Sequence, residues 1–250
     1  MKSTIAEELR KIEKEYNVEI IYAVESGSRA WGFASPDSDY DVRFIYKRKK
    51  NDYLKLEKTR DVIELPIDDV LDINGWDLDK TLRLLYKSNP TLFEWLSSPI
   101  VYKNTNSAEK LKEISKEYFY PRPSLYHYLN MAKNNYREYL KGEMVKAKKY
   151  FYVIRPILAC QWILDKGIAP PMLFSELAAA ELPPELKSDI DYLLDIKMNN
   201  PEMKLIPKIQ ILNDYIEKSI EEISSKIEQL EDSEKKMDSL NEFFLNEIND

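Results

Sequence analysis

The apolar pattern of this 250-residue chain changes character near residue 105. Before that point, short runs of strand-type residues alternate with helical patterns, whereas after it the apolar residues recur at helical spacing almost throughout. Strands mixed with helices, followed by helices alone, are typical of an α/β domain that precedes an all-helical one. The sequence therefore predicts two domains, residues 1–105 and residues 106–250.

Strand-type runs in the first hundred residues define the expected sheet. They occupy residues 18–24, 40–46, 61–65 and 70–73, and Pro66 separates the last two. Helices are expected over residues 3–16, from Asp77 onward and just after Pro90. In the second domain they are expected over residues 107–119, 124–140 and 144–165, followed by shorter helices between proline pairs.

The last forty residues carry an apolar stripe. From Ile209 to Ile248, Ile, Leu, Met and Phe residues recur at alternating three- and four-residue steps with one gap, which predicts a long heptad-like helix. One interpretation is a helix or helical hairpin that packs on its own domain. The other is the seam of a homodimer.

Composition excludes several kinds of catalytic site. A single Cys160 excludes an internal disulfide and a multi-thiolate zinc site, and a single His127 excludes histidine-rich chemistry. Catalysis must therefore rest on carboxylates, hydroxyls, Lys or Arg. Because 37 Lys and Arg stand against 44 Asp and Glu, for a net charge of −7, the chain lacks the charge of a general nucleic-acid binder, although a local basic groove is compatible with it.

Neither a membrane span nor a secretion signal is expected. The chain contains no run of eighteen apolar residues, and its first residues turn acidic at Glu7 and Glu8 where a signal peptide needs an apolar stretch. We therefore expect a cytoplasmic protein with no membrane partner.

A glycine-containing turn follows the first predicted strand. Two of the chain's five glycines fall in the segment Glu25-Ser26-Gly27-Ser28-Arg29-Ala30-Trp31-Gly32. Gly27 lets the backbone approach a ligand closely, and Ser28 offers a hydroxyl and an amide at the start of a helix, where anions are favoured. This segment predicts a phosphate-binding turn.

An acid pair follows in the segment Ser38-Asp39-Tyr40-Asp41, which begins ten residues after Ser28. Asp39 and Asp41 are separated by one residue, so on a strand their carboxylates point to the same face. Two carboxylates about 4 Å apart repel by roughly 4 kcal/mol at an effective dielectric near 20, which favours a bound cation. Hard oxygen ligands near a phosphate indicate Mg²⁺ or Mn²⁺. The alternative is a solvated acid pair that caps a turn.

A two-metal site for phosphoryl chemistry usually uses a third acid. Asp72 lies between apolar neighbours on the last predicted strand, and Glu64 lies in the same way one strand earlier. Asp77 is the third candidate and is also suited to cap the helix that follows. We prefer Asp72 to Glu64.

This ordered pattern resembles the nucleotidyltransferase superfamily of DNA polymerase β, in which a Gly-Ser turn, an acid-x-acid pair and a third acid follow one another. Gly27-Ser28, Asp39, Asp41 and Asp72 match in order. More narrowly, Gly27 to Gly32, Ser38 to Arg43, Gly75-Trp76-Asp77-Leu78 and Ser88-Asn89-Pro90 resemble the predicted bacterial and phage nucleotidyltransferases that include RNA-ligase-associated polymerase-β-like proteins. The narrower resemblance extends over about two thirds of the chain.

The resemblance implies a catalytic domain with a mixed sheet and an active site in a cleft closed by the helical domain. Asp39, Asp41 and Asp72 would be the catalytic and metal-binding residues for two Mg²⁺ or Mn²⁺ ions, and Gly27 and Ser28 would hold the phosphates of a nucleoside triphosphate. A nucleoside monophosphate would pass to an acceptor hydroxyl, and pyrophosphate would leave. An RNA 3′ end, a protein hydroxyl and a small alcohol are the acceptors considered. The rival is a nucleotide-binding regulator, such as one half of a toxin–antitoxin or defence pair.

Basic and aromatic residues in the helical part are further nucleotide-binding candidates. In Lys146 to Pro156, the side chains of Lys148, Tyr152 and Arg155 share a helix face, with Lys149 beside them, and this face suits a triphosphate and a base. The alternative is a solvated basic patch beside a packed aromatic stripe. Arg29 and Trp31, just after the Gly-Ser turn, either line the nucleotide pocket or wedge the turn onto the sheet. His127 is expected in aromatic packing, with phosphate contact as the alternative.

Overall fold

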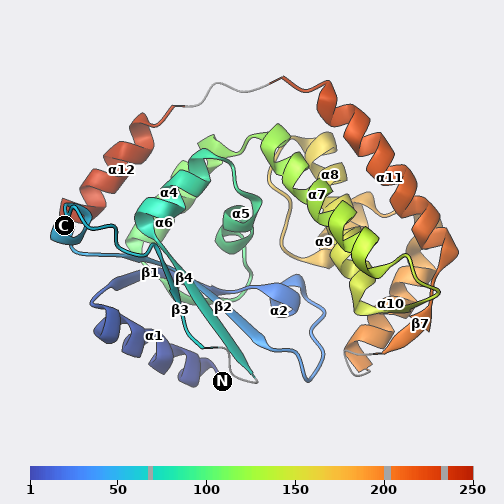
Figure 1. Ribbon diagram of the computed structural model, residues 1–250, viewed down its shortest axis with the longest axis horizontal. Coiled ribbons are helices and arrows are strands. Elements are labelled where there is room, and N and C mark those ends of the chain that lie inside the picture. The colour runs from blue at the N-terminus through green and yellow to red at the C-terminus, as the bar shows by residue number, and fades with distance from the viewer. Residues whose placement is uncertain (67–69, 200–203, 232–235, 250) are drawn as a thin grey trace. The chain divides into compact units, whose positions relative to one another are not determined.

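A mixed five-stranded sheet forms in the computed structural model, with the strand order β3-β4-β2-β1-β5 (Figure 1). Strands β2 and β4 are parallel, and the other neighbours are antiparallel. The strands are β1 (Glu19–Glu25), β2 (Tyr40–Lys47), β3 (Val62–Glu64), β4 (Leu71–Asp77) and β5 (Val101–Asn104). The predicted α/β class with a mixed sheet is therefore confirmed.

The structure describes residues 1–66, 70–199, 204–231 and 236–249. Their contacts divide the chain into two compact units. The first unit contains residues 1–27 and 39–119 together with the C-terminal helix α12 (Asp238–Asn249). The second unit contains residues 28–38 and the chain from Tyr120 to the end of α11 (Gln210–Glu228).

Helices cover both faces of the sheet in the first unit. Helix α1 (Lys2–Tyr16) buries Ile5, Leu9 and Ile12, which recur at helical spacing, in one core with Val42 and Phe44 of β2. Figure 1 shows α1 on one side of the sheet and α4 to α6 on the other. The remaining helices of this unit are α3 (Lys50–Tyr53), α4 (Leu78–Tyr86), α5 (Pro90–Leu96), α6 (Asn106–Ser115) and the 3₁₀ turn Lys116–Tyr118.

Capping residues explain where two predicted helices begin. The carboxylate of Asp77 accepts a hydrogen bond from the amide of Asp79 at the start of α4. Asn89 caps α5, and Pro90 occupies its first turn, where the missing N–H has no cost. The helix starts expected at Asp77 and Pro90 are confirmed.

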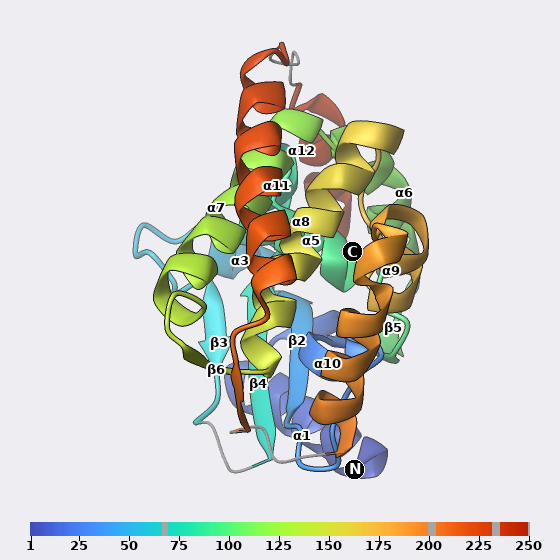
Figure 2. The same cartoon turned by 90° about the vertical axis from the view of Figure 1, so that its right-hand side faces the viewer.

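The second unit is built around packed helices. Helices α7, α8 and α11 pack on one another, and Figure 2 shows α11 running beside α7. A short two-stranded sheet joins β6 to β7. Besides α11, the second unit contains α7 (Pro121–Tyr139), β6 (Met144–Lys146), α8 (Lys148–Lys166), α9 (Phe174–Glu181), the 3₁₀ turn Pro184–Leu186, α10 (Lys187–Asn199) and β7 (Leu205–Pro207). The short helix α2 (Gly27–Trp31) joins the two units.

The helix expected over residues 144–165 is wrong at its start. Residues 144–146 form β6, in which Val145 pairs with Ile206 of β7, and α8 begins only at Lys148. The local pattern cannot reveal this pairing because the partner strand lies about sixty residues further along the chain. Strand β5 was likewise not predicted, since its four residues are only partly buried at the edge of the sheet.

The single long C-terminal helix is also wrong. Helix α11 ends at Glu228 and α12 begins at Asp238, and the two helices belong to different units. Leu212, Ile216 and Ile223 are buried in the second unit, whereas Leu240 is buried in the first. The apolar residues of the stripe are therefore buried in the cores of two different units of one chain. A homodimer formed through the stripe stays an untested prediction, and burial of these residues within the chain does not require it.

The two units also differ in extent from the expected domains. Helices α6 and α12 lie in the sheet unit, where α12 packs against α4 and α6. Residues 28–38 lie in the helical unit, because Phe33 packs on Phe151 at a ring-centroid distance of 4.7 Å and on Phe174 at 5.5 Å. Apolar contacts, rather than chain order, assign these segments.

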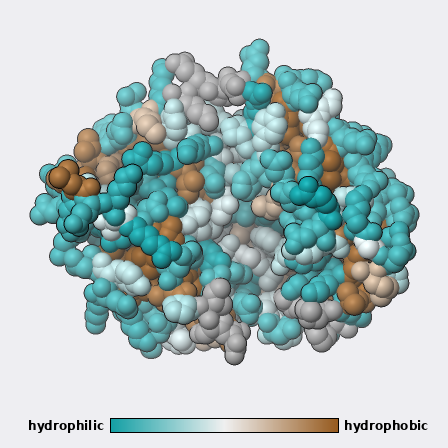
Figure 3. All heavy atoms as spheres, viewed as in Figure 1, coloured by the Kyte–Doolittle hydropathy of each residue, from teal (hydrophilic) through white to brown (hydrophobic). Residues whose placement is uncertain are grey.

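The described helices include none that is long and apolar enough to cross a membrane. The face drawn in Figure 3 is mainly hydrophilic, with smaller hydrophobic areas between the hydrophilic side chains. Scattered apolar side chains of this kind are normal on a protein surface.

Candidate active site

The Gly-Ser turn packs directly against the acid-bearing strand. The amide of Ser26 donates to the carbonyl of Asp41 at 2.8 Å. Gly27 has a φ of +60°, and a Cβ atom at this position would lie 2.8 Å from Cγ of Asp41 and overlap its carboxylate. Glycine is therefore required at position 27 both for the backbone conformation and for the close approach of Asp41.

Asp41 and Asp72 face each other across two parallel strands. They are register partners in the β2–β4 pair, and each is the second residue of its strand. Both are half-buried, whereas the alternate residues Val42 and Ile73 are buried on the face that packs on α1. The fold therefore brings together two carboxylates that lie 31 positions apart in the sequence.

Arg43 lies between these two carboxylates. Its Nη2 atom is 3.1 Å from Oδ1 of Asp41 and 2.6 Å from Oδ2 of Asp72. Its Nη1 atom donates to the carbonyl oxygens of Val42, at 3.1 Å, and Asp72, at 2.9 Å. One cation thus bridges the acid pair and also ties β2 to β4.

The other third-acid candidates have different surroundings. Glu64 pairs in register with Asn74 on the outer strand β3, and its carboxylate accepts hydrogen bonds from Asn74 and Arg60. Asp77 is buried, caps α4 and receives hydrogen bonds from Tyr53 and Arg48. Burial raises the pKa of the Asp77 carboxyl. The geometry therefore favours Asp72 as the partner of Asp41.

Asp39 lies just before β2 and is exposed. Within the described residues, no three His, Cys, Asp or Glu side chains are grouped as metal ligands. The oxygens of Asp41 and Asp72 nevertheless face a single cationic nitrogen, and hard oxygens of this kind are the donors that Mg²⁺ prefers. The pair fits an ion that takes two carboxylates and leaves its other positions to water and phosphate.

The segment that follows the Gly-Ser turn is held within the helical unit. Arg29 donates to the carbonyl of Ser38 at 2.6 Å. Lys197 of α10, whose exposed fraction is only 5%, donates to the hydroxyls of Ser35 at 3.0 Å and Ser38 at 3.3 Å. These contacts fix the loop that leads from Ser28 to Asp39. Lys197 carries no local sequence signal that would mark it as a partner of this loop.

The aromatic and basic residues of α8 gather around Trp31. Tyr152 packs edge-on against Trp31 at a ring-centroid distance of 6.0 Å, and the guanidinium of Arg155 lies 4.7 Å from the centre of the indole ring. Arg155 is only 2% exposed and donates to the carbonyl of Met172. The ammonium of Lys149 lies 3.6 Å from the ring centre of Tyr139. Trp31 therefore packs on α8 within the helical unit, whereas the alternative expectation placed it on the sheet, and Arg155 packs in the interior of the same unit.

Lys148 and His127 occupy the flanks of this packing. Lys148 is half-buried at the first position of α8. His127 is half-buried on α7 and meets Tyr128 edge-on at 6.0 Å, in agreement with the expected aromatic packing. Cys160 is fully buried, and burial raises the pKa of its thiol. A buried neutral thiol is not a nucleophile.

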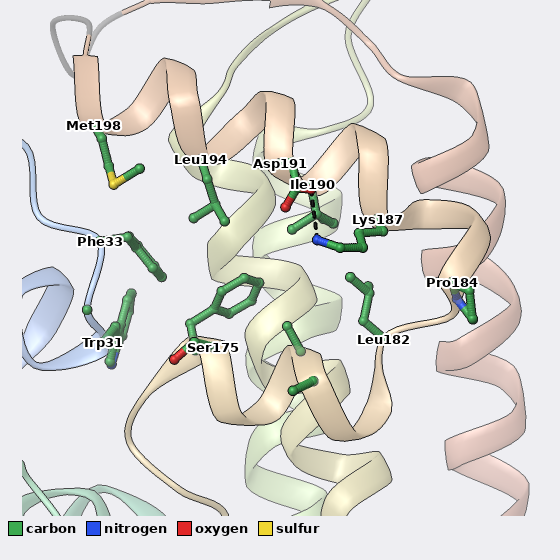
Figure 4. A pocket seen from close by; sticks show the side chains of 14 residues that line it. Trp31, Phe33, Ser175, Leu182, Pro184, Lys187, Ile190, Asp191, Leu194 and Met198 are labelled. Carbon is green, nitrogen blue, oxygen red and sulfur yellow. Dashed lines mark hydrogen bonds and ion pairs between the residues drawn. The ribbon is translucent and has the colours of Figure 1, made fainter.

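A cavity of about 550 Å³ opens beside Trp31 within the second unit (Figure 4). Its walls come from residues 31–33, α9 and α10, and the charged side chains on them are Lys187 and Asp191, which form an ion pair at 2.9 Å. The lining residues are Trp31, Gly32, Phe33, Phe174, Ser175, Ala178, Ala179, Leu182, Pro184, Lys187, Ile190, Asp191, Leu194 and Met198. Because its one cation is already paired, this apolar cavity does not suit a triphosphate.

A buried carboxylate beside the acid pair was missed at the level of sequence. Glu25, the last residue of β1, has no exposed surface and accepts a hydrogen bond from the amide of Asp41 at 2.8 Å. The only available signal was an acidic residue at the end of an otherwise apolar strand.

Replacement of Gly27 by Ala tests the close approach of the turn to Asp41. We expect the variant to lose about 1–3 kcal/mol of stability and at least about 100-fold in activity, because the new methyl group displaces the carboxylate. Gly167→Ala is the matched control, since Gly167 has a φ of +68° but no atom near the added Cβ. Chemical denaturation and a transfer assay measure both variants. Equal activity in the two would contradict the steric explanation.

Comparison with known proteins identifies the family of this chain. The family model RlaP, described as the RNA repair pathway DNA polymerase beta family, matches residues 1–246. A Bacillus subtilis (strain 168) protein named "Uncharacterized protein YcgL" is 53% identical over 254 residues, which cover 99% of this chain and 96% of that protein.

A solved structure of a nucleotidyltransferase-like protein from Exiguobacterium sibiricum 255-15 is 13% identical, covers 90% of this chain and 74% of its own, and has a TM-score of 0.33, a likeness too weak to support a conclusion. The family model, by contrast, spans almost the whole chain. This chain therefore belongs to the RNA repair pathway DNA polymerase beta family, within the polymerase-β-like nucleotidyltransferase superfamily.

Proposed function

We propose that this protein transfers a nucleoside monophosphate from a nucleoside triphosphate to the 3′ hydroxyl of an RNA, with Mg²⁺ or Mn²⁺ as cofactor. The observation that carries the proposal is the placement of Asp41 and Asp72 in register on parallel strands, beside a glycine that lets the Gly-Ser turn lie against the carboxylate of Asp41. The acceptor oxygen would attack the α-phosphorus, the bond from that phosphorus to the bridging oxygen would break, and pyrophosphate would leave.

Each residue has a distinct part in this proposal. Asp41 and Asp72 would hold the divalent ion, with Asp39 as a further ligand. When bound, such an ion neutralises phosphate charge and lowers the pKa of a hydroxyl that it contacts. Gly27 would allow the triphosphate to approach the strand, and the hydroxyl of Ser28 would donate to a phosphate oxygen. Arg43 would exchange a carboxylate partner for a phosphate oxygen.

Two observations favour RNA as the acceptor. The matching family is described by an RNA repair pathway. In addition, residues 121–149 carry seven Lys and Arg but only two Glu, although the whole chain has a net charge of −7. Tyrosines are interleaved with these cations: Arg122 lies 5.9 Å from the ring centre of Tyr126, and Lys149 lies near Tyr139. Basic and aromatic side chains together suit a single-stranded RNA.

An incorporation assay tests the proposal. The protein is incubated with Mg²⁺, each α-labelled nucleoside triphosphate in turn and a single-stranded RNA with a free 3′ hydroxyl. The matched acceptor ends in a 3′-deoxy nucleotide. We expect label in the first RNA and none in the second. RNA binding should also weaken with salt, with a logarithmic slope of about −0.7 for each phosphate contact.

Two other results of this assay would each support a different function. Label in protein or in a small alcohol, with none in RNA, would overturn the RNA acceptor and identify a different transferase. Nucleotide binding without incorporation into RNA, cell protein or small molecules would indicate a regulator of the same fold.

A further inference from the structure

We infer that Glu25 is a positioning residue that holds Asp41 in place for the divalent ion, an inference that rests on the function proposed above. Glu25 is not offered as an ion ligand or a reacting group. It acts through the backbone of Asp41, and it would set how tightly the acid pair binds metal.

Both oxygens of the Glu25 carboxylate are used. Oε1 accepts the amide hydrogen of Asp41 at 2.8 Å, and Oε2 accepts a hydrogen bond from the hydroxyl of Tyr102 on β5. Its backbone is held as well: the amide donates to the carbonyl of Ile100 at 2.9 Å, and the carbonyl accepts from the hydroxyl of Ser98 at 2.6 Å. Hydrogen bonds therefore hold both the carboxylate and the backbone of Glu25.

The position of Glu25 explains why a carboxylate is needed there. After Glu25 the chain leaves the sheet to form the Gly-Ser turn, so its main chain no longer offers a ladder acceptor to the amide of Asp41. Ser26 still donates to the carbonyl of Asp41, and the side chain of Glu25 takes the amide. Residues 25 and 26 together bind both backbone polar groups of Asp41, directly before Gly27.

A structural role alone does not require a charge at this position. A buried carboxylate carries a large desolvation cost, and a neutral amide side chain could accept the same hydrogen bond. An ionised Glu25, however, would place a second negative charge beside Asp41, and such a charge attracts a divalent ion more strongly than a singly charged guanidinium. It would therefore favour exchange of the guanidinium for a divalent ion. Outer partners of metal ligands commonly change metal affinity by about 10–100-fold.

The test is direct Mn²⁺ binding to the full-length protein, measured by electron paramagnetic resonance without nucleotide. Glu25→Gln keeps the shape and the hydrogen bond to Asp41 but removes the charge. We expect its dissociation constant for Mn²⁺ to rise by about 10-fold. Tyr102→Phe, which loses one partner of Glu25 and keeps the charge, should show a smaller rise. Both variants should unfold at temperatures close to that of the unmodified protein.

Tyr22→Phe is the matched control. Tyr22 is another buried polar residue of β1, and its hydroxyl donates to the carbonyl of Trp95, away from Asp41. This control should bind Mn²⁺ as the unmodified protein does. Unchanged Mn²⁺ affinity in Glu25→Gln, or no Mn²⁺ binding by the unmodified protein, would overturn the inference. If Glu25→Gln weakens Mn²⁺ binding but the unmodified protein transfers no nucleotide, the proposed function fails and the positioning role stands.

Discussion

Asp41→Asn is expected to abolish nucleotidyl transfer, with a loss of at least about 1,000-fold, which corresponds to roughly 4 kcal/mol of transition-state stabilisation. The amide has nearly the same shape as the carboxylate and can still accept a hydrogen bond from Arg43, but it lacks the charge that binds a divalent ion. Stability should change by only about 0–1 kcal/mol, because the ion pair with Arg43 is partly exposed. Incorporation of α-labelled nucleotide measures the loss.

Asp61→Asn provides the control for this substitution. Asp61 is an exposed acid of the same unit, and its carboxylate pairs with Lys80 at 3.3 Å. Its variant should retain transfer, which would show that loss of one negative charge in the unit is not sufficient. Asp39→Asn is expected to behave as Asp41→Asn does, because we propose Asp39 as a further ligand. Wild-type transfer in both the Asp39 and Asp41 variants would eliminate the proposed mechanism.

The second large effect distinguishes Asp72 from Glu64. Asp72→Asn should lose transfer by about the same factor as Asp41→Asn, since both carboxylates contact the same guanidinium nitrogen. Glu64→Gln should lose less than about threefold, because the Glu64 carboxylate is an exposed partner of Arg60. Parallel transfer assays with denaturation curves measure both. The reverse order of losses would make Glu64 the third acid.

Local sequence patterns predicted the strands whose residues are consecutive in the chain. The apolar run before Gly27 predicted β1, and the alternation around Asp41 predicted β2 with its acid face. The short run around Asp72 predicted the beginning of β4. What the pattern did not contain was the order of the strands. Asp41 and Asp72 become register partners only when β2 pairs with β4 in parallel, and this pairing joins residues that are far apart in the sequence.

The partners of the site were beyond sequence analysis for the same reason. Glu25 reads as one acidic residue after an apolar strand, and its role depends on the amide of Asp41, 16 positions away. Lys197 lies more than 150 positions from the two serines that it binds. The sequence places Arg43 within the acid motif. Its role as a bridge between two carboxylates depends on β4, which brings Asp72 beside it.

The terminal helices show a different kind of error. The stripe from Ile209 onward correctly indicated buried apolar faces, but periodicity does not specify which core receives them. Helix α12 carries Glu247, whose carboxylate is buried beside Lys47 of β2 at 3.2 Å. That ion pair joins residues 200 positions apart and anchors the helix to the sheet unit.

If the proposed divalent ion binds, the guanidinium of Arg43 would separate assembly of the sheet from binding of that ion. In small zinc domains, the ligands cannot come together until the metal arrives, so a chelator unfolds the protein. Here the repulsion between Asp41 and Asp72 is already balanced by Arg43, a residue of the same chain. Its guanidinium pairs with both carboxylates and donates a hydrogen bond to the backbone of β4. On the proposed function, the chain would complete its fold without the ion, and the metal-bound form would differ from it mainly in the position of the Arg43 side chain.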